Sequence, residues 1–493
     1  MATLILLPLL APLALAAPAA LRRTAAWSAA LDIAAALLIL AAGVALLAAT
    51  IADGPATVGP LRADPLAAFM LTVIGAVGVV ALWGGLPARR DPAASPDGAF
   101  TALVCLFLSA MSLAVLADDL GILWVAVEAT TITTAFLVNQ RGGPNALEAA
   151  WKYVVLGSVG VAVAFLGIVL LYAAARAAGT PTLSWVALAS GSIPLDPALT
   201  RMALALAALG FATKAGLAPM HSWLPDAHSQ APAPVSGLMS GVLLSVALYA
   251  ILRIQAISDT VLGPGFMRGL LVAGGLLSLA VAAALMLTQR DYKRLLAYSS
   301  IEHMGLMALA AAAGGALATS ALLLHMLGHG LVKAAMFVLA GRILAAEGTS
   351  KVADVRDLLA RRPDLARPFL AGTAALLGFP PFVLFFTEVA IVIAGWQAGL
   401  GLPMAIALGL LLVVFAGLGR HVSAMTISAG PPPATQPTGN ATPPDPTPPT
   451  VALGAGPGAP VAIALAAAAA LGFLAVPLAD VLARAAAALG GGS

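Results

Sequence analysis

Apolar side chains fill the chain in runs of about twenty residues, which short polar stretches separate. A helix of this length crosses the hydrocarbon core of a bilayer, whereas the strands of a membrane barrel would alternate over about ten residues. The pattern therefore predicts an all-α polytopic membrane protein with about fourteen transmembrane helices. The predicted spans lie near residues 2–21, 30–51, 65–86, 99–117, 120–138, 151–175, 202–221, 235–256, 267–288, 295–313, 317–342, 368–395, 402–420 and 459–483.

Two of the predicted spans are interrupted by proline. The seventh breaks at Pro219, and the twelfth, five spans later, breaks at Pro380-Pro381. A shift by an odd number of spans reverses orientation, so the pattern predicts two inverted five-helix repeats with broken seventh and twelfth helices. The predicted parts are N-terminal helices one to three in residues 1–98, the two repeats in 99–256 and 267–425, a Pro-rich linker in 429–458 and a C-terminal helix in 459–493.

Composition supports the membrane assignment and excludes several other classes. The chain is 61% hydrophobic and 9% charged, against about 25% charged residues in soluble domains. The isoelectric point near 9.2 indicates basic loops rather than a nucleic-acid partner. Cys105 is the one cysteine, which excludes a disulfide framework and any cysteine-built metal or iron–sulfur site. We expect no cofactor and no metal.

Basic residues predict the orientation of the chain. With the N-terminus outside, the cytoplasmic loops hold fifteen of the 24 Lys and Arg residues and the outer loops hold six. Such an excess of positive charge is typical of cytoplasmic loops. Arg22 and Arg23 follow the first apolar run instead of preceding it, so we expect residues 2–21 to be a retained span. The predicted location is the cell inner membrane, with several passes and an outside N-terminus.

Charged residues inside predicted spans are the main candidates for function, because they are costly there and usually mark an ion or substrate path. Lys214 lies near the middle of the seventh span, five residues before Pro219, and Glu128 lies in the fifth span. Glu388 follows the break in the twelfth span. Each of these carboxylates and this amine has a structural alternative as a buried or water-facing charge.

The eleventh span carries a regular polar stripe. His325, His329 and Lys333 are four residues apart and therefore share one helix face, over about 12 Å. Closely spaced titratable groups with water between them are suited to a proton relay.

Other polar residues are weaker candidates. Lys152 begins a span and could simply reach the membrane surface; Glu302 and His303 are near a span end, where they would cap the helix or line an opening. His221 and His228 flank the Pro219 break, where a rigid connector is favoured over a metal site because no third ligand is evident. Asp118 and Asp119 either cap a helix or mark an exit.

Several segments together resemble one family. They are similar to the antiporter-like membrane subunits of respiratory complex I, of group 4 membrane-bound hydrogenases and of multisubunit cation/proton antiporters, and two of them most resemble the F-type branch of hydrogenase-4, found in formate hydrogenlyase-type complexes. The resemblance covers roughly residues 60–425. The five segments are KAGLAPMHSWLPDAHSQAPAPVSGLMSG, DYKRLLAYSSIEHMG, HMLGHGLVKAAMFVLAG and, for the branch, EATTITTAFLV and ALEAAWKYVVLGSVG.

The resemblance implies roles for the candidate residues. Glu128 and Lys214 match a pair whose separation changes the proton affinity of the lysine. The residues His325, His329 and Lys333 match the central relay helix, and Glu388 matches the acidic residue that leads protons outward. Many complex I relatives have a lysine in the eighth helix where this chain has Ser245, so the step between the two half-channels requires water, His303 or another group.

Three functions follow as hypotheses. The first is a proton-translocating subunit of a redox-driven complex, without redox chemistry of its own, that works with other membrane subunits and a hydrogenase-like or quinone-linked soluble arm. The second is a subunit of a cation/proton antiporter that has no redox partner. The third is a non-conducting membrane scaffold, which the charges inside the spans disfavour because a scaffold would be more stable without them.

Overall fold

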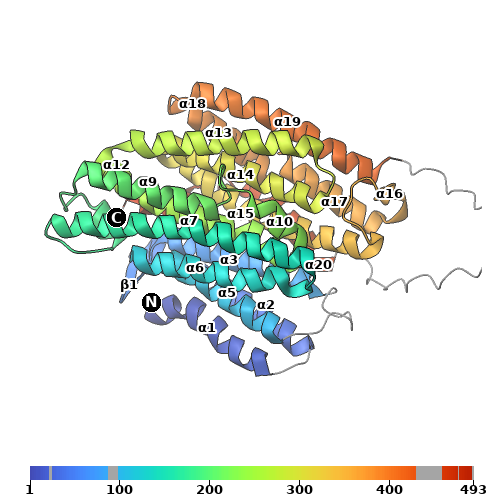
Figure 1. The fold of residues 1–493 in the computed structure, drawn as a ribbon, viewed down its shortest axis with the longest axis horizontal. Coiled ribbons are helices and arrows are strands. Elements are labelled where there is room, and N and C mark those ends of the chain that lie inside the picture. The colour runs from blue at the N-terminus through green and yellow to red at the C-terminus, as the bar shows by residue number, and fades with distance from the viewer. Residues whose placement is uncertain (22–24, 87–97, 429–457, 476, 491–493) are drawn as a thin grey trace, which may run out of the picture.

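Helices running side by side form almost the whole molecule (Figure 1). The computed structural model describes residues 1–493 except 22–24, 87–97, 429–457, 476 and 491–493. The bundle confirms the predicted all-α polytopic class. The predicted Pro-rich linker lies outside the described residues apart from Gly458, as do Arg22, Arg23, Arg89 and Arg90, which contributed to the predicted orientation.

The first half of the chain forms helices, one short hairpin and one 3-10 turn. These elements are α1 (Ala2–Leu21), α2 (Ala25–Asp53), β1 (Ala56–Val58), β2 (Leu61–Ala63), α3 (Pro65–Gly84), α5 (Gly98–Leu116), α6 (Leu120–Val138), η1 (Asn139–Arg141), α7 (Pro144–Ala177), α8 (Trp185–Ala189), α9 (Pro197–Lys214), α10 (Trp223–Gln230), α11 (Ala233–Leu238), the π-helical η2 (Met239–Leu243) and α12 (Leu244–Leu262).

The second half is helical throughout its described residues. Its elements are α13 (Pro264–Thr288), α14 (Tyr292–Ala313), α15 (Gly315–Glu347), α16 (Leu358–Arg361), α17 (Pro363–Leu376), α18 (Val383–Gln397), α19 (Gly401–Thr426), α20 (Gly458–Leu474), α21 (Ala479–Ala487) and η3 (Ala488–Gly490).

Eleven helices of the described residues are long and apolar enough to cross a membrane, or twelve if the bent pair α20 and α21 counts as one span. The predicted seventh and twelfth spans are not among them. The seventh ends as a helix at Lys214 and resumes with the short α10, and the twelfth is divided into α17 and α18. The breaks are therefore present, whereas the total of fourteen and the two inverted repeats stay predictions.

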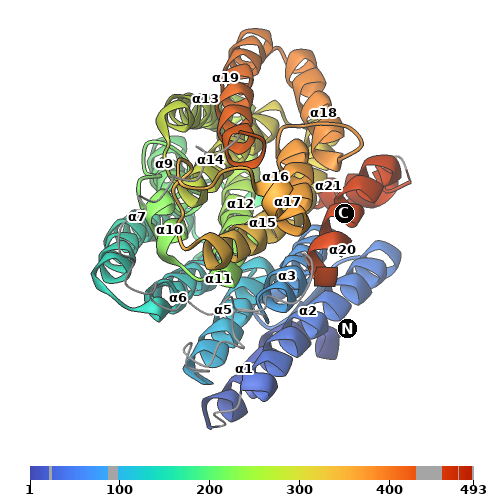
Figure 2. The ribbon, with the colours of Figure 1, turned by 90° about the vertical axis from the view of Figure 1, so that its right-hand side faces the viewer.

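Three helices form the centre of the bundle. In their most apolar windows, the span α11–α12 is 100% buried and α14 and α15 are each 94% buried, whereas α13 is 39% buried and α19 is 28% buried. Figure 2 shows α12, α14 and α15 inside, with α1 and α2 along one edge and α18 and α19 on another. The candidate residues of α14 and α15 thus lie where no lipid reaches.

Glycine allows α15 to approach the first half closely. Side chains at Gly241 and Gly330 would collide with backbone, since a Cβ on Gly330 would lie 2.6 Å from the carbonyl oxygen of Gly241. Small residues at helix contacts are how membrane helices pack backbone against backbone. The π-helical segment η2 is therefore held directly against the polar stripe of α15.

A buried ion pair ties distant parts of the chain together. Asp64 is the N-cap of α3, where it accepts a hydrogen bond from the Ala67 amide, and it also accepts from Arg253 Nη2 of α12 at 2.6 and 2.7 Å. Arg253 also donates to the Ala488 carbonyl and lies 3.9 Å from the ring centroid of Trp185. Helices from the start, middle and end of the chain meet at this one guanidinium.

Candidate functional site

Lys214 is fully buried at the end of α9, and a tyrosine holds its amine. Its Nζ donates to Tyr153 Oη of α7 at 2.5 Å and lies 4.4 Å from the centroid of the same ring. Thr134 Oγ1 is also 2.5 Å from Tyr153 Oη, and the indole of Trp223 packs on the ring at 4.9 Å between centroids. The lysine thus has a hydrogen-bond acceptor and an aromatic face at the level where its helix stops.

Glu128, the predicted partner of Lys214, is oriented by other groups. Ser158 donates to Glu128 Oε1 at 2.7 Å and Thr131 donates to Oε2 at 3.2 Å. The ion pairs of the described residues do not join Glu128 to Lys214. The amine and the carboxylate are therefore present in one region but parted, each with its own neutral partners.

The break after Lys214 depends on local backbone geometry. Gly216 has φ +72°, which favours glycine, and the indole of Trp223 donates to the Thr213 carbonyl at 2.9 Å. This bond satisfies a carbonyl that the end of α9 leaves without a helical partner. His221, in the break, is half-buried, and its Nδ1 has no hydrogen bond within the described residues.

The predicted stripe on α15 is buried throughout, and His303 of α14 joins it. Nδ1 of His303 lies 3.2 Å from Nε2 of His325, and the rings of His303 and His329 are 4.9 Å apart between centroids. A neutral imidazole donates from one nitrogen and accepts at the other. Three imidazoles from two helices therefore form a compact cluster, in which His303 is central rather than accessory.

A carboxylate and an amine flank this histidine cluster. Glu302 is buried and its Oε2 lies 3.4 Å from Nε2 of His303. Lys333, one turn after His329, donates to the Leu296 carbonyl at 2.8 Å and to the Ser299 hydroxyl. Among the described residues, no group of three or more His, Cys, Asp or Glu side chains has an arrangement that could hold a metal ion.

The histidine cluster reaches the broken twelfth span through a hydroxyl. His325 Nδ1 lies 2.9 Å from Thr387 Oγ1 of α18, and Glu388 is the next residue. The Glu388 carboxylate lies against Gly378, which has φ +63° in the break between α17 and α18. The structure thus brings His325 and Glu388 to neighbouring positions on two helices.

His228 and Ser245 are buried polar residues near the contact between the halves. His228 stacks on Phe337 with 5.1 Å between ring centroids, and neither of its ring nitrogens has a hydrogen bond within the described residues. Ser245 Oγ is buried and likewise without a protein partner in the part of the chain that the structure describes. Ser240 of η2 and Ser300 of α14 do connect the halves, with 2.7 Å between their hydroxyl oxygens.

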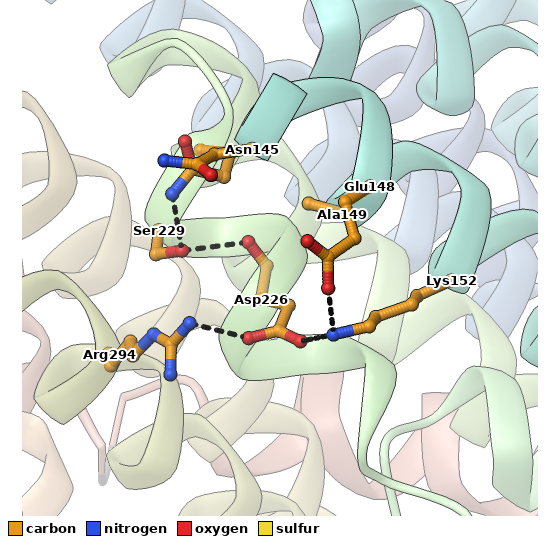
Figure 3. A pocket seen from close by; sticks show the side chains of 8 residues that line it. Asn145, Glu148, Ala149, Lys152, Asp226, Ser229 and Arg294 are labelled. Carbon is orange, nitrogen blue, oxygen red and sulfur yellow. Dashed lines mark hydrogen bonds and ion pairs between the residues drawn. The ribbon is translucent and has the colours of Figure 1, made fainter. Parts of the chain in front are cut away.

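Lys152 lies in a charged opening at one end of the bundle (Figure 3). Its Nζ is 2.7 Å from Glu148 and 3.2 Å from Asp226 of α10, and Arg294 of α14 is 2.7 Å from the other oxygen of Asp226. The cavity here, of about 210 Å³, also has Ser229 and Gln230 in its wall. Asp226 therefore links α7, of the first predicted repeat, to α14, of the second.

Asp119 lies at the opposite end of its helix from this opening. Its carboxylate is the N-cap of α6 and accepts from the amides of Gly121 and Ile122 at 2.8 and 3.0 Å. The geometry is that of an ordinary helix cap, the first of the two roles expected for this residue.

Two residues of the site were missed by sequence reasoning. Tyr153 and Thr387 look like ordinary span residues, since tyrosine and threonine occur in apolar helices without any role. Their position relative to a charge is the only informative signal: Tyr153 follows Lys152 directly, and Thr387 precedes Glu388.

Comparison with protein families places this geometry in context. The family model described as NADH:quinone oxidoreductase/Mrp antiporter, transmembrane, matches residues 117–415. A hydrogenase-4 component F homolog from Methylacidiphilum infernorum is 40% identical over 309 residues, which are 62% of this chain and 64% of that protein. The chain thus spans somewhat less than two thirds of that relative. NADH-quinone oxidoreductase subunit N from Desulforudis audaxviator is 31% identical over 80% of each chain.

Solved structures share the fold over nearly the whole length. A chain of the archaeal membrane-bound sulfane sulfur reductase has a TM-score of 0.84 at 25% identity, with 99% of this chain and 97% of that chain covered. A chain of the Mrp complex from Dietzia sp. has a TM-score of 0.85 at 22% identity over the same shares, a likeness of fold alone. The matched family model covers both broken helices and every candidate residue discussed above, and the chain belongs to the NADH:quinone oxidoreductase/Mrp antiporter family of membrane subunits.

Proposed function

We propose that this chain is a proton-translocating membrane subunit of a redox-driven complex, of the hydrogenase-4 or NADH-quinone oxidoreductase kind. The observation that carries the proposal is the set of buried titratable side chains at two broken helices, Lys214 at the first and the histidine cluster with Glu388 at the second. Burying such groups is costly, and inside a membrane protein they are retained for ion movement. The two named relatives are components of hydrogenase-4 and of NADH-quinone oxidoreductase, which supports the same assignment.

In the first half, the mobile element is the amine of Lys214. When Lys214 contacts Glu128, the carboxylate stabilises the charged amine, and when the two part, the amine is left with only neutral partners and its proton is released more readily. The arrangement with Lys214 on Tyr153, and Glu128 on Ser158 and Thr131, corresponds to the parted state. A lysine side chain is long and flexible enough to exchange between the two acceptors.

In the second half, the proton moves along side chains already in contact. Lys333 and Glu302 flank the histidine cluster, in which His303 and His325 are 3.2 Å apart. The hydroxyl of Thr387, 2.9 Å from His325, can accept a proton from the ring while it donates its own toward the Glu388 side. Each step requires only the transfer of a proton along a hydrogen bond and a reorientation of the group that passed it.

The step between the halves passes serine hydroxyls. Ser245 occupies the position where many complex I relatives have lysine, and it cannot hold a proton as a cation. The paired hydroxyls of Ser240 and Ser300 are next to Ser299, which binds Lys333. Hydroxyls with bridging water are sufficient for transfer, because each donates and accepts at once.

The partners and the location follow from the same assignment. The chain works with other membrane subunits in a multisubunit complex, and a hydrogenase-like or quinone-linked soluble arm supplies the redox energy. The end with Lys152 and Arg294 faces the cytoplasm, and the N-terminus faces outward across the cell inner membrane. This orientation rests on the excess of basic residues at that end.

The substitution Lys214→Ala tests the proposal most directly. In inverted membrane vesicles that contain the assembled complex, the variant should lose proton uptake, measured by quenching of a ΔpH-sensitive dye, because no other group at the first break can carry the charge. Arg367→Ala, an exposed substitution on α17, is the matched control and should leave uptake unchanged. If the Lys214→Ala complex assembles and still pumps at the normal ratio to electron transfer, the proposal is wrong.

Co-purification discriminates between the redox-driven complex and an antiporter. In a mild detergent, a nickel–iron or quinone-linked soluble subunit should accompany the chain. Recovery with small antiporter subunits alone, and sodium-dependent proton exchange without any electron donor, would instead support the second hypothesis.

A further inference from the structure

A second, larger cavity opens beside the mouth of Figure 3, at the same end of the bundle. Its volume is about 700 Å³, within the range of about 300–1,000 Å³ that is usual for ligand sites. The walls come from the ends of α13 and α19, the start of α14 and residues 350–356. Five cationic side chains line it: Arg290, Arg294, Lys351, Arg356 and Arg420.

Backbone pairing forces these cations together. The Val352 amide donates to the Arg290 carbonyl at 2.9 Å, and the Tyr292 amide donates to the Ser350 carbonyl at 3.0 Å. The pairing fixes residues 350–352 against residues 290–292 and so sets Lys351 close to Arg290. Like charges at short range repel one another, so the cluster is most stable when an anion lies among them.

The protein itself supplies little negative charge here. Asp291 is the one acidic side chain of the lining, and its carboxylate caps α14 and accepts from the Ser350 hydroxyl. Arg294 is engaged by Asp226. The ion pairs found within the described residues include none for Arg290, Lys351 or Arg420, whose side chains are exposed.

Apolar surface continues from the cavity along the outer helices. Leu285 and Leu287 of α13 are about 40% exposed, and Leu412 and Phe415 of α19 are 71% and 44% exposed. These residues are one to two turns from Arg290 and Arg420, on helices that are mostly unburied in the bundle. A ligand with an anionic head and hydrocarbon chains would match both the cavity and the surface beside it.

We propose that this cavity binds an anionic phospholipid, with the phosphodiester headgroup among Arg290, Lys351 and Arg420 and the acyl chains along α13 and α19. Basic pockets between membrane helices at the cytoplasmic side are suited to such headgroups. A soluble phosphate or an acidic peptide would use the cations but not the adjoining exposed leucines, so the lipid is the favoured occupant.

The test is lipid binding to the full-length chain. The chain is purified in detergent, stripped of lipid and titrated by native mass spectrometry with phosphatidylglycerol or with phosphatidylcholine of the same acyl chains. Phosphatidylglycerol should bind at least tenfold more tightly. The double substitution R290Q/R420Q should weaken it about thirtyfold, which corresponds to about 1 kcal/mol for each arginine.

Control variants make the result specific. R176Q/R367Q removes the same charge from two exposed positions outside the cavity and should bind phosphatidylglycerol normally. R290K/R420K keeps the charge and should retain most of the binding. Equal binding of the two lipids, an R290Q/R420Q variant that binds like the control, or displacement of the lipid by millimolar inorganic phosphate or by a short acidic peptide would overturn the proposal.

Discussion

Tyr153 shows how one neutral side chain can decide where a buried charge rests. Its hydroxyl and ring both contact Lys214, and Thr134 fixes the hydroxyl from the other side. The tyrosine is a positioning residue: it contacts the amine that carries the proton but does not need to ionise. Without it, the nearest stabilising acceptor for the lysine would be the predicted partner Glu128.

The substitution Tyr153→Phe tests this role. It keeps the ring and removes the hydroxyl, so the lysine should remain with Glu128 for longer and proton uptake should slow by roughly tenfold, the equivalent of ~1.5 kcal/mol for a hydrogen bond to a charged group. The measurement is the initial rate of uptake by vesicles across a pH series. Tyr172→Phe, on the same helix and 38% exposed, is the matched control.

A positioning role predicts a pH profile that moves in Tyr153→Phe and not in Tyr172→Phe. A slower rate with an unchanged profile would mean that Tyr153 only supports packing.

At the scale of elements, the contact between α15 and α18 joins the histidine cluster to the second break. It consists of a single polar bond, from His325 to Thr387, beside an apolar interface. Thr387 also bonds its own helix at the carbonyls of Val383 and Leu384. The hydroxyl can therefore turn between the helix backbone and the imidazole, as a relay group must.

Thr387→Val removes that hydroxyl with little change of shape. Proton uptake should fall roughly tenfold, on the same ~1.5 kcal/mol basis, while the assembled complex still transfers electrons. Thr373→Val is the control, since Thr373 is also buried but its hydroxyl bonds only the Phe369 carbonyl of its own helix. If both variants pump equally well, the path to Glu388 does not use Thr387.

At the scale of the whole molecule, the Asp64–Arg253 pair connects the N-terminal helices, the first predicted repeat and the C-terminal segment. Both side chains are 1% exposed. Breaking a buried pair by removing one partner leaves the other charge without compensation. The pair therefore matters less for the strength of its attraction than for the cost of separating it.

Arg253→Ala should destabilise the full-length chain by about 3–5 kcal/mol, the cost of an uncompensated buried charge. Asp64 would keep its capping bond to Ala67, so the loss would report the ion pair and not the cap. Thermal unfolding in detergent gives the measurement. Arg484→Ala breaks an exposed pair with Asp480 and should leave the unfolding temperature unchanged; an equal effect of both variants would contradict the argument.

The fold and much of the site could be predicted from sequence because membrane burial leaves strong one-dimensional signals. Runs of apolar residues gave the positions of the helices, and Lys214 and the stripe on α15 were evident as charges where lipid is expected. The place of His303 could not be predicted, because it depends on how α14 packs against α15. The separation of Glu128 from Lys214 depends on side-chain torsions, about which spacing along the chain carries no information.

Asp226 has a consequence for which ions can approach the protein. With Glu148 it balances the charges of Lys152 and Arg294, so the mouth of Figure 3 carries no formal net charge. The cavity beside it is strongly positive. Hydronium would be repelled from the positive cavity and admitted at the balanced mouth, whereas anions would prefer the reverse. Two neighbouring openings on one membrane surface would thereby sort ions by sign before any of them reaches a helix break.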